Sequence, residues 1–450
     1  MPGYASWKQL FREELFQMRE EGYDLTGLPE FADDSSFLLP FPGCEQPETD
    51  ADVWKKAYSL LTERMKEPLR ADYPYREMNN WEEILADASP VPELTPLMDE
   101  EYIKRLRGAV YGRFAAVILG KPLEMGMNAL DVRTYLEGAD AWPLNDFVPE
   151  YSPGTGKYAR KDCIYSCRGR IQFAQSDDDI HYTCIALLLA ERYGLNFKPG
   201  QVGNMWLDNI PYHWFWCASR QAYYHMINQV PAEEIPTLLN PWRECIDGQI
   251  RCDLWGYISP GDPVRASLGA WRDCSFSLTK NGIYGGMFTA GCIAGAMTES
   301  PTVDRILDSG LSVIPQKSRL AEMVHLVREW YAETPDRDTV CRKIYERWGH
   351  LPFAATINNM AIVVLALLDG NLDYTKTITS AVCCGLDTDC NAGTAGSIAG
   401  AAVGIDGVEE RWYTCLNDTA KTVVASVNQI RISELIDRIA KVREKLRSDS

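Results

Sequence analysis

The chain is poor in histidine, with five among 450 residues, and this counts against metal sites built on histidine clusters. It also has no excess of positive charge, because 63 acidic residues outnumber 45 lysines and arginines and give a formal net charge of −18. That balance counts against a nucleic-acid backbone or an anionic membrane as the main partner. An anionic small ligand would need a local counter-charge, such as a metal ion or an arginine.

Long apolar runs are missing as well. The stretch from Met360 to Leu368 is among the longest and falls short of a membrane span. The first 25 residues are charged and amphipathic, without the apolar core of a signal peptide. The fourteen cysteines are scattered, and Cys163 and Cys167 form a close pair with no second pair to complete a zinc site. We therefore expect a cytoplasmic, soluble protein with reduced and mostly buried thiols.

Alternating β patterns are nearly absent, so helices must supply most of the structure. We expect an all-α domain over residues 98–450, preceded by a helical N-terminal extension over residues 1–97. Ser176 is the expected N-cap of a helix that continues through Tyr193 and stops at Gly194.

A second expected helix, after Asp389, consists almost entirely of small residues. Gly396, Gly400 and Gly404 recur every four positions and give this helix one smooth face. Another backbone is expected to lie closely against that face.

Two short acidic runs carry the strongest functional signal. SDDD occupies positions 176–179 and DTD occupies positions 387–389, each at the start of an expected helix. Helix capping or an Asx turn would explain either run alone. Three successive aspartates repel one another, however, and no lysine or arginine lies near the second run in sequence to offset buried charge. Hard oxygen ligands in two clusters are what a pair of Mg²⁺ ions requires.

Three motifs, in the same order, resemble those of the ADP-ribosylglycohydrolase family. They are GRFAAVILGKPLE at 112–124, QSDDDIHYT at 175–183 and GLDTDCNAGTAGSIAGAAVG at 385–404. The central stretch from Asn240 to Pro263 is also similar to one bacterial branch of that family. The resemblance covers roughly residues 98–407.

The resemblance implies an orthogonal multi-helix bundle with two Mg²⁺ ions, or Mn²⁺, in a cleft that holds the distal ribose of an ADP-ribosyl substrate. Carried over residue by residue, it assigns the metal ligands Ser176, Asp177, Asp178, Asp387 and Asp389. Glu124, or one of the metal-bound aspartates such as Asp178, is then the candidate acid or base. The residues leave that choice open.

Four further residues are candidates for contacts with substrate. Arg251, which follows Gly248 and Gln249, has the planar donor group that a diphosphate requires, and a structural role is equally compatible with its position. His181 lies one helical turn beyond the acids, where it either orients a ligand or serves as a hydrogen-bonded structural histidine.

The expected activity is Mg²⁺-dependent hydrolysis of the ribosyl C1 bond, which releases ADP-ribose from a protein side chain or a small molecule. Two alternatives stay open: a glycosidase of the same fold acting on another ribosyl compound or nucleoside, and a non-catalytic ADP-ribose binder. Three departures from the family pattern favour these alternatives. Cys390 replaces a hydroxyl ligand, Leu278 replaces a histidine, and Ala116-Val117 replaces Gly-Asp.

Overall fold

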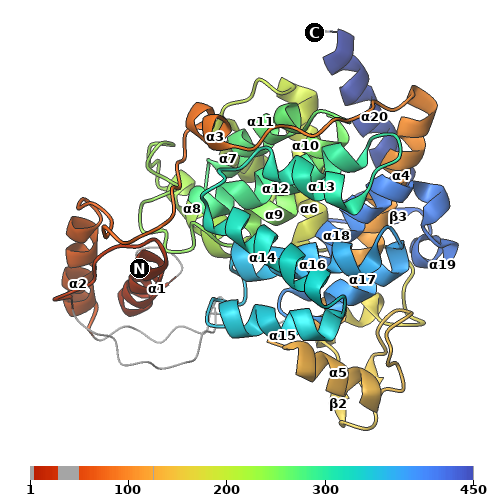
Figure 1. Ribbon diagram of the computed structural model, residues 1–450, viewed down its shortest axis with the longest axis horizontal. Helices are drawn as coiled ribbons and strands as arrows, with labels where there is room; N and C mark the ends of the chain where they lie inside the picture. The colour runs from red at the N-terminus through yellow and green to blue at the C-terminus, as the bar shows by residue number, and fades with distance from the viewer. Residues whose placement is uncertain (1–4, 29–49, 125, 449–450) are drawn as a thin grey trace.

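The computed structural model describes residues 5–28, 50–124 and 126–448, and within them the fold is all-α (Figure 1). The first half contains α1 (Trp7–Glu20), α2 (Ala51–Arg64), α3 (Trp81–Asp87), α4 (Asp99–Gly120), α5 (Ala129–Gly138), α6 (Asp178–Tyr193), α7 (Pro199–Asn209), α8 (Cys217–Ile227), α9 (Asp247–Arg251) and α10 (Asp253–Tyr257). The second half contains α11 (Pro263–Cys274), α12 (Lys280–Ala296), α13 (Val303–Leu311), α14 (Arg319–Glu333), α15 (Arg337–Trp348), α16 (Thr356–Gly370), α17 (Tyr374–Cys383), α18 (Thr388–Val403), α19 (Glu410–Tyr413) and α20 (Ile432–Ser448).

Short 3₁₀ turns and two small hairpins complete the described chain. The turns are Lys121–Leu123, Lys161–Ser166, Tyr212–Trp214, Ile405–Gly407 and Thr414–Leu416. The hairpins are antiparallel and pair β1 (Tyr151–Ser152) with β2 (Lys157–Tyr158) and β3 (Thr419–Lys421) with β4 (Gln429–Arg431). No helix in the described ranges is long and apolar enough to cross a membrane.

The centre of the fold is a close pair of helices, α4 and α18, and glycines make the contact. A Cβ on Gly112 would lie 2.8 Å from the carbonyl oxygen of Gly396, and one on Gly396 would lie 2.7 Å from the Cβ of Ala116. Gly108 and Gly400 meet in the same way. The expected smooth face of small residues is therefore used as predicted, and it lies against α4. The contact brings the end of α4 to the beginning of α18.

Helices α12 and α16 lie in the middle of the body and are buried along almost their whole length (Figure 1). Their sequences are rich in Gly, Ala and aliphatic residues, so they have no polar face to present to water. These two helices form the wall behind the acidic runs.

The start of α6 differs from the expectation. Asp177, not Ser176, is the N-cap, and its Oδ1 accepts a hydrogen bond of 2.9 Å from the amide of Asp179. The helix ends before Gly194, which adopts a φ of 62°, as expected. Aspartate caps as well as serine does, so the sequence alone did not separate the two neighbours.

The N-terminal segment (described residues 5–28 and 50–97) lies along one side of the body, with α1 against it and α2 outside (Figure 1). Buried ion pairs anchor α1: Arg243 contacts Glu14 at 2.6 Å and Glu21 at 2.7 Å. Lys280 also contacts Glu21, at 2.9 Å. Although burial opposes it, the two cations hold the pKa of Glu21 below its usual range.

Glu21→Gln is expected to destabilise the protein by about 3 kcal/mol, because it leaves buried Arg243 and Lys280 without a shared carboxylate. Glu20→Gln is the matched control, since Glu20 is partly exposed and its ion pair with His350, at 3.5 Å, lies at the surface. That control should change stability by less than about 0.5 kcal/mol. Urea unfolding of both variants provides the measurement, and equal losses would contradict the anchoring role.

Candidate metal centre

The two acidic runs meet in space although they lie far apart in sequence. The thiol of Cys390 donates to Oδ2 of Asp179 at 3.1 Å, across 211 positions of the chain. On each side the acids are grouped closely enough to share an ion, with candidate ligand atoms within 4.8 Å of one another in 177–179 and in 387–390. Both groups lie at the start of a helix, where the backbone amides favour negative charge.

The end of α4 completes the acidic group. Gly120 lies so close to α18 that an added Cβ would be 2.6 Å from the Cα of Asp389. Thr388 fixes this junction by donating from its hydroxyl to the carbonyl of Gly120 at 2.9 Å. The 3₁₀ turn Lys121–Leu123 follows and carries Lys121 at its start, with Glu124 just after it.

Two of the aspartates form ion pairs with cations that lie outside the acidic runs. Lys121 is buried and pairs with Oδ2 of Asp177, whose Oδ1 already caps α6. Asp179 pairs with Arg113 at 2.9 Å, and Arg113 also contacts Asp253 at 2.9 Å. The usable signals were Lys121, three residues before Glu124, and Arg113, a charged residue within the apolar second half of α4.

Glu124 has its own cation, Arg160, at the rim of the group. Arg160 also pairs with Asp162 at 2.6 Å. Burial and the neighbouring Asp389 raise the pKa of Glu124 well above its usual value, although Arg160 opposes the shift. Glu124 is therefore a carboxyl group that can carry a proton beside the metal ligands.

Amide side chains hold the second acidic run. Asn359 accepts from the backbone amide of Asp387 at 3.2 Å and from the side chain of Asn391 at 2.8 Å. Gln249 donates to Asn391 at 3.2 Å, so it supports the ligands from behind. Sequence reasoning placed Gln249 near the site but missed Asn359, which lies in an otherwise apolar helix.

Ser176 and His181 act together. The Nε2 atom of His181 lies 2.9 Å from the hydroxyl of Ser176 and accepts from the amide of Val423 at 3.3 Å. Burial lowers the pKa of His181 to about 3, so the ring is neutral and Ser176 donates to it. The hydroxyl oxygen of Ser176 therefore remains available to a ligand, and His181 positions it.

The structure does not place Arg251 or Gly248 where substrate can reach them. Arg251 is 2% exposed, pairs with Asp273 at 3.0 Å and lies over the ring of Trp206. Gly248 is a packing residue, since a Cβ there would lie 3.1 Å from Leu278 and would meet the carbonyl of Gly282. Both residues make structural contacts in the interior of the described chain, where Leu278 also packs.

The remaining carboxylates are strongly perturbed. Burial and the charges of Asp177 and Asp389 raise the pKa of Asp178 well above its usual value. Burial, Asp389 and Glu124 do the same for Asp387. Asp177 differs, because Lys121 lowers its pKa even though burial opposes this. Such shifts are typical of acids grouped to hold a cation.

These residues fit a hard divalent ion. Asp178, Asp387 and Asp389 have no salt-bridge partner among the described residues. Oδ1 of Asp387 is buried and accepts no hydrogen bond from the described chain. Carboxylate and hydroxyl oxygens are the ligands that Mg²⁺ prefers.

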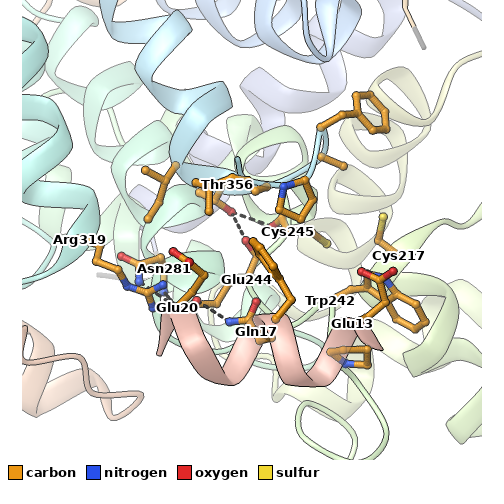
Figure 2. Close-up of a pocket in the computed structure, with 18 residues that line it drawn as sticks. Glu13, Gln17, Glu20, Cys217, Trp242, Glu244, Cys245, Asn281, Arg319 and Thr356 are labelled. Carbon is orange, nitrogen blue, oxygen red and sulfur yellow. Dashed lines mark hydrogen bonds and ion pairs between the residues drawn. The ribbon is translucent and has the colours of Figure 1, made fainter. Parts of the chain in front are cut away.

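A pocket lies between α1 and the body, at the start of α16 (Figure 2). Glu13, Gln17 and Glu20 reach into it from α1, and Trp242 and Thr356 face them from the body. Gln17 donates to Glu244 at 2.6 Å across the pocket. Thr356 opens α16, one turn before Asn359, so the N-terminal segment lies near the support of the metal centre.

A third group of metal-type side chains borders the pocket: Cys217, Cys245 and Asp247. Its donors are already bonded to one another and to their neighbours. Cys245 donates to Asp247, which also accepts from the hydroxyl of Ser219.

The chain was compared with family models, solved structures and curated proteins. The family model described as ADP-ribosylglycohydrolase matches residues 98–449. A solved structure titled "ADP-ribosylglycohydrolase-related protein complex" is similar at 14% identity and a TM-score of 0.46, over 77% of this chain and 99% of that chain. The comparison with curated proteins found no match.

Asp178→Asn is expected to stabilise the chelator-treated protein at about pH 8, by roughly 1–3 °C, and to have little effect below about pH 4, where this carboxyl group is protonated in both the folded and the unfolded chain. Because the pKa of Asp178 is raised in the folded protein, wild type loses stability as the pH rises from the unfolded pKa through the folded pKa. Asparagine carries no charge to desolvate. Thermal unfolding across this range, with exposed Asp406→Asn as control, provides the check. A difference between Asp178→Asn and wild type that did not vary with pH would contradict the assigned pKa shift.

Proposed function

The chain belongs to the ADP-ribosylglycohydrolase family, and on that premise we propose that it is a metal-dependent hydrolase of ADP-ribosyl bonds. The observation that carries the proposal is the meeting of two acidic runs and Glu124 around unpaired carboxylates. The proposed substrate is an ADP-ribosylated protein side chain or small molecule, and the proposed product is ADP-ribose. The proposed ion is Mg²⁺, with Mn²⁺ as a substitute.

Ser176, Asp178, Asp387 and Asp389 are the proposed ligands. When bound, the ion offers positive charge to the ribose hydroxyls and to the attacking water, whose pKa it lowers. The protein's part is positioning: Asn359 fixes Asp387 and His181 fixes Ser176. Because both supports are buried, the ligands keep one arrangement before substrate arrives.

Glu124 is the proposed acid and base. Hydrolysis at a ribosyl C1 passes through an oxocarbenium-like state, in which the leaving group gains a proton and water loses one. Burial and Asp389 raise the pKa of Glu124, and a raised pKa favours proton exchange by a carboxyl group. Asp178, although partly exposed, is assigned to the metal because the helix start holds it beside Ser176.

Asp387→Asn and Asp178→Asn are each expected to lower turnover by on the order of a hundredfold or more, because a charged ligand and the positioning of the ribose are lost together. The assay is ADP-ribose release from arginine-, serine- and nucleotide-linked substrates, with Mg²⁺ and with chelator. The exposed variant Asp406→Asn is the control. Release that withstands both substitutions and the chelator would overturn the metal hydrolase. A wild type inactive on every substrate would favour a binder or a different glycosidase.

Glu124→Gln separates catalysis from metal binding. The expected result is a loss of turnover of about 10²–10⁴-fold, as for removal of a general acid or base, with Mg²⁺ affinity changed by no more than a few-fold. The pH–rate profile should also lose the limb assigned to Glu124. If calorimetry instead showed that Mg²⁺ binding fell together with activity, Glu124 would be a ligand.

A further inference from the structure

Lys121 lies where a buried cation is unusual, among the carboxylates of the metal centre. It is 6% exposed and begins the turn that Gly120 and Thr388 hold against α18. Its ammonium pairs with Asp177 and feels the charges of Asp389 and Glu124. A lysine kept this far from water is stabilised by the acids around it.

Both carboxylate oxygens of Asp177 already have a partner in this arrangement. Its Oδ1 accepts from the amide of Asp179 and its Oδ2 holds Lys121. The resemblance assigned Asp177 as a ligand, so one of the ligands expected on the α6 side is already in use. Moving it to a metal would leave the Lys121 ammonium buried and unpaired, which is costly.

The α18 side has lost a ligand as well. Cys390 replaces the hydroxyl that the family pattern places after the second aspartate, and its thiol is turned to Asp179. Asp179 is itself held by Arg113. Thiol sulfur is a poor ligand for Mg²⁺, so this position offers nothing to a second ion.

What remains suits one ion. Among the acids of the two runs and Glu124, those without a salt-bridge partner in the described chain are Asp178, Asp387 and Asp389, with Ser176 beside Asp178. One Mg²⁺ is commonly held by one or two carboxylates and fills its other positions with water or substrate. A second ion would have to share these few ligands with the first.

We propose that the centre holds one divalent ion per chain and that the ammonium of Lys121 takes the place of the second. This proposal rests on the proposed metal-dependent function. Lys121 is then a positioning residue, because it holds Asp177 and through it the start of α6. The ammonium group of Lys121 supplies positive charge permanently, so a second ion does not have to bind.

The test counts ions on the full-length protein after chelator treatment. Mn²⁺ titration followed by electron paramagnetic resonance, with calorimetry for Mg²⁺, should give one ion per chain and the spectrum of an isolated Mn²⁺. Two ions with an exchange-coupled spectrum would overturn the role of Lys121 and leave the metal hydrolase intact. No bound ion would overturn the proposed function itself.

Lys121→Met provides the second arm, since it keeps the length of the side chain and removes the charge. It should free Asp177 and raise the count to two ions. Lys280→Met is the matched control, because Lys280 is a lysine largely buried and paired with Glu21 away from the centre; it should stay at one. A Lys121→Met protein that still bound one ion with unchanged affinity would contradict the proposal. If this variant does not fold, the wild-type count and spectrum decide alone.

Discussion

The centre depends on how closely two helices approach. Gly108, Gly112 and Gly120 on α4 face Gly400, Gly396 and the start of α18, and each would place a Cβ inside its neighbour's backbone or side chain. At these glycines the two backbones lie in close contact. The end of α4 is thereby fixed at the beginning of α18, where Lys121 and Glu124 lie close to the 387–389 run. A methyl group at Gly108, Gly112 or Gly120 would force the two helices apart and move Lys121 and Glu124 away from that run.

Close packing buries several carboxylates near one another, and the other residues of the site compensate for their negative charge. Carboxylates held at two helix starts and buried behind α12 and α16 cannot all remain charged without partners. The fold supplies three cations from α4, the turn after it and the loop before α6. Each pairs with one acid of the centre: Arg113 with Asp179, Lys121 with Asp177 and Arg160 with Glu124. The acids left over are grouped, and an ion is the partner that their chemistry admits. Side-chain cations thus neutralise some of the carboxylates, and a bound ion would neutralise the rest.

The sequence predicted the parts that depend on short-range pattern. The all-α class, the small-residue helix and the two acidic runs follow from spacing and residue type, and the family resemblance joined the two runs into one expected site. The sequence could not predict which acids form ion pairs, because Arg113 contacts Asp179 and Lys121 contacts Asp177 only after folding. For the same reason the sequence did not predict the ion pair between Arg251 and Asp273. The two residues lie 22 positions apart, and no local pattern shows that both are buried. The charged residues of a motif are visible in a sequence, whereas their partners are not.

The N-terminal segment takes part in this arrangement although no proposed ligand precedes Glu124. Removing it would leave Arg243 and Lys280 without Glu14 and Glu21. These two cations are the chain neighbours of Glu244 and Asn281, which line the pocket that α1 covers (Figure 2). Glu244 accepts from Thr356 through its backbone carbonyl at 2.9 Å, and Thr356 begins the helix that carries Asn359. Asn359 in turn holds the amide of Asp387. We keep a domain boundary near residue 98 as a proposal. All proposed ligands lie after this boundary. The contacts that hold Asp387 in place, however, begin at Glu244, which α1 covers.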